Sequence, residues 1–215
     1  MSLQLYFAPG ACSFVPHVAL EAAKAEFEPK LVKLHKGEQK TPEYLAMNPN
    51  GQVPVLVVDG KPLTQIVAIC DFLDRGFPKA GLLPTEPWAR SLALSQLAWM
   101  NNTVHPTFTR VFRTPEFAES EAAQAEVKKI AAAKYRTLLE RIQQWSAAAR
   151  PFWFGERISF HDAYAFTLLR WGGMAGVDAK ALPGYFAYIE RVMAAAPVAA
   201  ALERERVKLD TYKTD

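Results

Sequence analysis

The chain has 215 residues, of which 50% are hydrophobic and 22% charged, and its formal net charge is +3. This length predicts one large or two modest domains, and a weak charge without a dense basic cluster argues against nucleic acid as a partner. The only cysteines, Cys12 and Cys70, exclude a disulfide framework, and zinc-site spacings are absent. No apolar stretch reaches bilayer-spanning length, and residues 1–7 lack the pattern of a secretory signal. We therefore expect a cytoplasmic protein with no metal and no membrane contact.

Up to about residue 80, short strand-like and helix-like segments alternate along the chain. Alternating Leu3, Leu5 and Phe7 predict a strand, while Thr41 followed by Pro42 is typical of a helix cap and first helical residue. The predicted strands are residues 3–7, 27–34, 53–58 and 61–63, and the predicted helical segments are 14–25, a turn opening at 41–43, and 66–76. A two-residue hairpin turn is predicted at 59–60. The order β-α-β-α-β-β-α predicts a small α/β domain with a mixed sheet.

After a proline-rich linker at residues 77–87, the sequence predicts helices only. The predicted helices are residues 88–112 with a kink at His105-Pro106, 122–145, 163–171 and, as the last clear one, 184–195. Val127, Ile130, Leu138, Ile142 and Trp145 are predicted to form the apolar side of the second of these. Ser159 is predicted to cap the third, with Asp162 as its capping-box partner.

Cys12 lies between the first predicted strand and the first predicted helix. The unpaired N–H groups and the positive dipole end of a helix start stabilise a thiolate, so this position favours a reactive cysteine. Val15 occupies the third position after Cys12, so there is no C-x-x-C pair and any second sulfur must come from elsewhere. A packed structural cysteine explains the same residues about equally well.

Val53-Pro54 opens the third predicted strand. A cis peptide bond at this proline would leave the backbone groups of Val53 facing outward, where they could pair with an extended peptide. A simple β-turn is the alternative interpretation of these residues taken alone.

Several short motifs, in order and at family-like spacing, carry a resemblance over nearly the whole chain. They are residues 8–13 (APGACS), 48–54 (NPNGQVP) and 63–69 (LTQIVAI), then His105 with Phe108 and Phe112, and residues 160–164 (FHDAY) and 168–171 (LLRW). In these motifs the chain resembles the cytosolic glutathione S-transferases, most closely their bacterial beta class.

The resemblance implies an α/β plus all-α protein: a thioredoxin-like domain at residues 1–80, an all-helical domain at residues 88–215, and a homodimer. It implies glutathione as co-substrate, with no separate cofactor, and a small apolar electrophile as the other substrate. Cys12 and His105 are the implied catalytic residues. The implied glutathione-binding residues are Cys12, Ser13, Lys36, Gln52, Val53, Pro54, Gln65 and Ile66, and the implied electrophile pocket contains Phe108, Phe112 and Trp171.

Two positions depart from the family pattern. Ile66 stands where the family pattern resembles Gln or Glu followed by Ser, so one hydroxyl that would hold the γ-glutamyl end of glutathione is absent. Losing a hydrogen bond to a charged group costs about 1.5–3 kcal/mol, which predicts weakened glutathione binding. Pro106 stands where beta-class relatives often carry a lysine, which removes a cation near the site.

Some remaining residues have ordinary structural explanations. Cys70 lies on an apolar helical stripe and is predicted to be core. His17, His35 and His161 show no partner in the sequence and are predicted to be solvated or capping. Phe108, Phe112 and Trp171 could equally be core aromatics.

The sequence thus favours a detoxifying glutathione transferase, with glutathione-dependent disulfide reduction through Cys12 as a compatible activity. The alternative is a non-catalytic ligand-binding or interaction protein built on the same fold, and Ile66 favours it.

Overall fold

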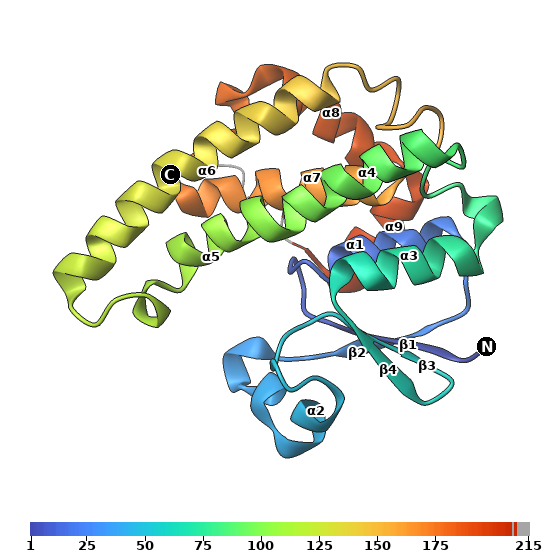
Figure 1. The fold of residues 1–215 in the computed structure, drawn as a ribbon, viewed down its shortest axis with the longest axis horizontal. Helices are drawn as coiled ribbons and strands as arrows, with labels where there is room; N and C mark the ends of the chain where they lie inside the picture. Colours follow the sequence, from blue (N-terminus) through green and yellow to red (C-terminus); the bar gives the residue numbers. More distant parts are fainter. Residues whose placement is uncertain (208, 210–215) are drawn as a thin grey trace.

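The computed structural model describes residues 1–207 and residue 209, in which a small sheet domain packs beneath a larger group of helices (Figure 1). The sheet of these residues has four strands in the order β2-β1-β3-β4. Their bounds are β1 Leu3–Phe7, β2 Glu28–Leu31, β3 Val55–Val58 and β4 Lys61–Thr64. β1 pairs parallel with β2 and antiparallel with β3, and β3 and β4 form the predicted hairpin. Asp59 and Gly60 both have positive φ, as a two-residue hairpin turn requires.

Helices cover both faces of this sheet. α1 (Phe14–Ala22) and α3 (Ile66–Gly76) lie between the sheet and the helical domain, while α2 (Pro42–Met47) lies on the far side (Figure 1). Strand alternation explains the two layers: Leu3 and Leu5 belong to the main core, whereas Val55 and Val57 pack with the α2 side. As predicted, Thr41 caps α2 by accepting a hydrogen bond from the Tyr44 N–H at 3.3 Å.

The second part of the described chain is helical. Its helices are α4 (Pro87–Trp99), α5 (His105–Phe112), α6 (Glu121–Ser146), α7 (Phe160–Gly172), α8 (Pro183–Ala194) and α9 (Ala196–Glu205). A π-helical turn, Met100–Val104, joins α4 to α5 directly before Pro106, so the predicted break occurs where proline removes a backbone donor. Short 3-10 turns occur at Leu34–Lys36, Glu38–Lys40, Pro78–Ala80, Thr114–Glu116, Gly173–Ala175 and Ala179–Ala181.

α7 forms the centre of the molecule, and only Arg170 among its residues is not buried. Its start has the predicted capping box: the Asp162 carboxylate accepts from the Ser159 N–H at 2.8 Å. The same carboxylate accepts from the Trp153 N–H at 2.9 Å and from the Tyr188 hydroxyl. α1 packs against both α7 and α9, and the Phe14 and Phe166 rings meet with centroids 5.0 Å apart. The helical domain thereby supports the helix that follows Cys12.

The structure differs from several of the sequence predictions. On the predicted apolar side of α6, Ile142 is buried and Leu138 and Trp145 pack against the core, but Ile130 is 60% exposed and Ala131 and Tyr135 are buried instead. α9 was missed, because an alanine-rich segment directly after α8 gives little hydrophobic periodicity. His17 and His161 are fully buried rather than solvated or capping. The helix predicted to reach residue 25 ends at Ala22, and the strand predicted at 27–34 is shortened to β2.

No single helix in the described ranges has the length and apolar composition needed to cross a membrane. Only α8 and α9 taken together meet those criteria, and they are bent by 82° relative to each other.

Candidate active site

Cys12 lies in a tight turn between β1 and α1. The Ala11 N–H donates to the Ala8 carbonyl at 3.0 Å. The Ser13 hydroxyl accepts a hydrogen bond from the Ala8 N–H at 3.1 Å and donates one to the Ala8 carbonyl at 3.3 Å. Ser13 is fully buried and lines neither of the cavities that contain Cys12. Its place in this structure is therefore to close the turn that presents Cys12.

The Cys12 thiol is a neutral donor in this structure. Its Sγ donates to the Val53 carbonyl at 3.4 Å, and the residue is 7% exposed. Burial raises the pKa of Cys12 to about 12, and although its own and the Ser13 backbone N–H groups lower the pKa, burial is the larger effect. The predicted thiolate stabilisation by the helix start is therefore present but outweighed.

A turn held by side chains presents Gln52 and Val53 opposite this thiol. The Asn48 amide and the Tyr44 hydroxyl donate to the Gln52 carbonyl at 2.7 Å and 2.9 Å. The Val53–Pro54 peptide bond is cis, as predicted.

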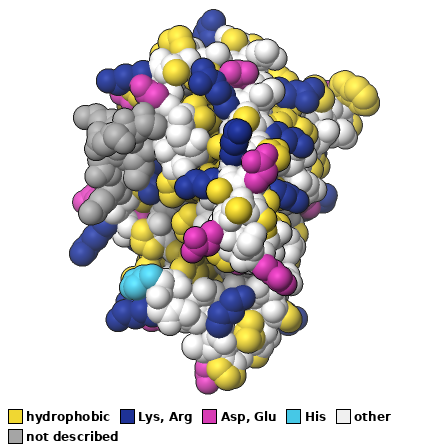
Figure 2. Space-filling model, turned by 90° about the vertical axis from the view of Figure 1, so that its left-hand side faces the viewer, with side chains coloured by type: hydrophobic (Ala, Val, Ile, Leu, Met, Phe, Trp, Pro, Cys, Tyr) yellow, Lys and Arg dark blue, Asp and Glu magenta, His cyan; other side chains and the backbone are white. Residues whose placement is uncertain are grey.

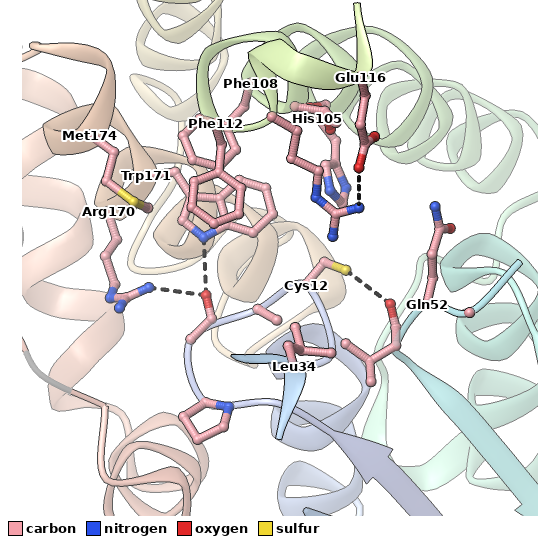
Figure 3. A pocket seen from close by; sticks show the side chains of 17 residues that line it. Cys12, Leu34, Gln52, His105, Phe108, Phe112, Glu116, Arg170, Trp171 and Met174 are labelled. Atoms are coloured by element: carbon pink, nitrogen blue, oxygen red, sulfur yellow. Dashed lines mark hydrogen bonds and ion pairs between the residues drawn. The ribbon is translucent and has the colours of Figure 1, made fainter. Parts of the chain in front are cut away.

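Two cavities, of about 320 and 340 Å³, meet at Cys12. The residues common to both are Cys12, Gln52, Val53, His105 and Thr109. Aromatic and apolar side chains distinguish the first cavity: Phe108, Phe112, Trp171, Met174 and Leu34, with Arg113, Glu116 and Arg170 among them (Figure 3). Polar groups distinguish the second, which contains Asn48, Gln65, Asn101 and Arg110 beside Pro54 and Ile66.

Three rings form a nearly parallel stack along the aromatic cavity. Phe112 stacks on Phe108 at 6.0 Å and 9°, and Phe108 stacks on Trp171 at 4.7 Å and 17°. Phe112 is 62% exposed, whereas Phe108 and Trp171 are buried. All three side chains predicted for the electrophile pocket therefore lie in one cavity with Cys12.

His105 lines both cavities and is held by a hydrogen-bond chain. Its Nδ1 lies 2.9 Å from the Tyr164 hydroxyl, which donates to the Asn101 side-chain carbonyl at 3.2 Å. Since the Tyr164 proton is used on Asn101, Nδ1 carries the histidine proton and Nε2 keeps a lone pair. Burial lowers the pKa of His105 to about 4, so the ring is neutral at neutral pH.

The start of α3 forms one end of the polar cavity. Gln65 is exposed with φ of +71°, and the Ile66 side chain is buried in the main core. The residue that replaces the family serine therefore supports packing.

Lys36 lies outside the two cavities that meet at Cys12. It lines a third, more open hollow of about 800 Å³, which shares Pro9, Leu34, Phe112 and Arg113 with the aromatic cavity. Among the predicted site residues, the structure gathers all but Ser13 and Lys36 around Cys12.

Both polar groups of the Gly10 backbone are held by the helical domain. The Gly10 N–H donates to Glu205 at 3.0 Å, and its carbonyl accepts from Arg170 and from the Trp171 indole N–H, each at 3.0 Å. The other oxygen of Glu205 lies 2.8 Å from Nδ1 of His17. Sequence reasoning missed this clamp, because its residues are more than 150 positions apart and Glu205 belongs to the missed α9.

Among the described residues, no group of three or more His, Cys, Asp and Glu side chains could hold a metal ion.

A mixed sheet with a cysteine turn beside a cis-proline defines a thioredoxin-like domain, here followed by a helical domain. Residues 1–75 match the model of the glutathione S-transferase N-terminal domain, and residues 100–196 match that of its C-terminal domain. The chain is 36% identical over 205 residues to glutathione S-transferase GST-4.5 of Xanthomonas campestris pv. campestris. The matched region covers 94% of this chain and 98% of that protein.

Solved structures give the same result. A glutathione transferase homolog from Sulfitobacter with bound glutathione has a TM-score of 0.88 and 29% identity, covering 94% of this chain and 98% of its own. A bacterial beta class glutathione S-transferase from Sphingomonas chungbukensis has a TM-score of 0.81 and 29% identity, covering 95% and 100%. The chain therefore belongs to the glutathione S-transferase family, and it is a transferase enzyme with a thioredoxin-like first domain.

Proposed function

We propose that this enzyme joins reduced glutathione to small apolar electrophiles, with the reacting sulfur beside Cys12. The observation that carries the proposal is the position of this one thiol, where a polar cavity and an aromatic cavity meet. The polar cavity suits a charged tripeptide and the aromatic cavity suits an apolar co-substrate.

Glutathione would lie extended along Val53. Its γ-glutamyl group would contact Gln65 and the N-terminus of α3, where helical N–H groups favour a carboxylate. Its cysteinyl backbone would pair with Val53, and its glycyl carboxylate would point towards Lys36 in the neighbouring hollow. The peptide sulfur would then sit between Cys12 and His105.

In the conjugation step, the glutathione thiol loses its proton to water, the resulting thiolate attacks the electrophilic carbon, a carbon–sulfur bond forms, and the leaving group departs with its electron pair. The neutral Cys12 thiol, which now donates to the Val53 carbonyl, can donate to the glutathione sulfur instead. The neutral His105 ring, with a pKa of about 4, is too weak a base to hold a thiol proton at rest. Its part is to accept a hydrogen bond through Nε2 from the S–H of bound glutathione, which positions the sulfur before its proton is lost.

Disulfide reduction through Cys12 is the second candidate activity, and the observation that favours it is a single thiol lining both cavities. Cys12 would attack a mixed disulfide, release the other thiol, and be freed by a second glutathione. The pKa of about 12 leaves little thiolate, so this route would be slow beside conjugation.

The homodimer, the cytoplasmic location and a role in detoxification are further parts of the proposal. An exposed apolar strip on α4, with Trp88 76% and Leu92 53% exposed, suits a subunit contact. Light scattering coupled to gel filtration would measure the subunit number.

The test is turnover of chlorodinitrobenzene and of a glutathione mixed disulfide by the wild type, Cys12→Ala and the control Cys70→Ala. We expect Cys12→Ala to keep conjugation, slowed by about 10–100-fold at most, the value of one charge-assisted hydrogen bond, and to lose disulfide reduction. Cys70→Ala should keep both activities. Loss of conjugation to background in Cys12→Ala alone would contradict glutathione as the attacking sulfur. Glutathione binding without any turnover by the wild type would support the non-catalytic alternative.

A further inference from the structure

The aromatic cavity continues into the third hollow, of about 800 Å³, around one wall made by Phe112 and Arg113. Leu31 and Leu34 give this hollow an apolar floor, and Leu31 is 49% exposed. Figure 2 views the molecule from the left of Figure 1 and shows Lys and Arg side chains interspersed with hydrophobic ones over this face. We call the aromatic cavity and this hollow together the trough, and its lining includes both Cys12 and Lys36.

The charged side chains along this trough are mostly cations. Of the described residues that line the two spaces, the charged ones are Lys33, Lys36, Arg113, Arg170 and a single carboxylate, Glu116. Arg170 donates to the Gly10 carbonyl, and Lys33 lies 4.0 Å from Glu38. Lys36 is the cation assigned above to glutathione. Arg113 is the cation that faces both spaces.

Arg113 has a partner that a ligand can replace. Its Nη1 lies 3.2 Å from the Glu116 carboxylate, and the two side chains are 37% and 56% exposed. Such exposed pairs contribute only about 0–1 kcal/mol, so the guanidinium can turn towards another anion at little cost. The field of Arg113 also reaches the reaction centre, because it lowers the pKa of both Cys12 and His105.

Arg113 directly follows Phe112, the exposed end of the ring stack. A planar ring laid on Phe112 would extend the stack, with an anionic substituent at the mouth of the cavity near Arg113. Guanidinium groups match carboxylate and sulfonate oxygens in two-point contacts.

Resting on the proposed function, we propose that the small electrophile has an apolar aromatic ring, which stacks on Phe112, and also one anionic group, a carboxylate or sulfonate, which binds Arg113. The reacting carbon faces Cys12, the glutathione sulfur bonds to it, and the halide leaves with the electron pair. The anionic group is unchanged in the reaction, so Arg113 determines specificity and does not react.

The test compares chlorodinitrobenzoate with its methyl ester, which has the same ring and leaving group without the charge. The variants are Arg113→Gln and the control Arg136→Gln, which removes an exposed arginine of α6 that lines none of the three spaces. We expect the ratio of kcat/KM for the acid to that for the ester to fall about 10–100-fold in Arg113→Gln, the range of a charge-assisted hydrogen bond. In Arg136→Gln the ratio stays at the wild-type value.

An unchanged ratio in Arg113→Gln, with the ester still converted, overturns this inference and leaves the proposed function standing. If neither these two compounds nor chlorodinitrobenzene is converted, the proposed function fails. Calorimetry then tests the inference without turnover, with the preformed glutathione conjugates of the acid and of the ester as ligands. Tighter binding of the acid conjugate that is lost in Arg113→Gln supports the inference, and equal affinities overturn it.

Discussion

Replacing Glu205 with alanine is expected to loosen the turn that carries Cys12. The carboxylate accepts from the Gly10 N–H and contacts His17, and all three groups are buried. Each buried group left without a partner costs about 1–3 kcal/mol, which gives about 2–6 kcal/mol for the Gly10 N–H and His17 together. Burial raises the pKa of Glu205, so the buried carboxylate is itself costly and its removal recovers part of this loss. We therefore expect a decrease of about 2–3 kcal/mol in the free energy of unfolding.

Urea unfolding at neutral pH, followed by circular dichroism, measures this loss. Glu205→Gln is the matched control, because its side-chain oxygen can still accept from Gly10, and it should lose less than half as much. Gly10→Ala is an independent perturbation of the same clamp, since a Cβ there would lie 2.7 Å from Arg170 Cζ at a φ of +66°. If Glu205→Ala unfolds within about 0.5 kcal/mol of the wild type, a range usual for surface substitutions, the clamp contributes nothing to stability and the reasoning is wrong.

Three further outcomes follow from burial. Cys12 should be alkylated by iodoacetamide at neutral pH at least about 100-fold more slowly than free cysteine, because its pKa is raised to about 12, and peptide mass spectrometry that finds rapid labelling of Cys12 would contradict this. Burial lowers the pKa of His105 and of His161 from 6.5 to about 4, so the unfolded chain binds more protons between these values. The free energy of unfolding should therefore fall as pH drops from 6.5 to 4, by up to about 3 kcal/mol per histidine, and a flat urea-unfolding profile over this range would refute it. Ile66→Ser should bind glutathione about 10–100-fold more tightly, through a new hydroxyl at the α3 start, while the free energy of unfolding falls by about 2–4 kcal/mol because the core loses a buried side chain. Equal stability of Ile66→Ser and the wild type would show that Ile66 is not packed.

Local chemistry allowed much of the fold to be predicted from the sequence. The Asp59-Gly60 hairpin, the Thr41 cap and the Ser159 capping box depend on residues that are adjacent or one turn apart, and all three are present. Their conformations are set by backbone sterics and nearby hydrogen bonds, which pattern reasoning can follow.

What depends on packing could not be predicted in the same way. α6 buries the small Ala131 and leaves Ile130 exposed, because small side chains allow neighbouring helices to approach closely. The prediction from the sequence pattern gave more weight to the large apolar residue and therefore placed Ile130 in the core. The Cys12 pKa depends on how completely the helical domain covers the turn, a property with no local signal.

The candidate site shows the same difference between residues in local motifs and residues brought in by long-range packing. Cys12, Val53 and Gln65 lie in recognisable motifs and converge as expected. Glu205 has no motif, and its bond to Gly10 spans 195 residues.

The central claim is that glutathione binds where the two cavities meet, with its sulfur at Cys12. Calorimetric titration of the wild type and Cys12→Ala with reduced glutathione tests it most directly, joined to mass spectrometry after exposure to oxidised glutathione. We expect saturable binding below millimolar concentration in both proteins, and a single glutathione adduct that maps to Cys12 and disappears in Cys12→Ala. Absence of binding at millimolar glutathione, or an adduct at Cys70 instead, would contradict it.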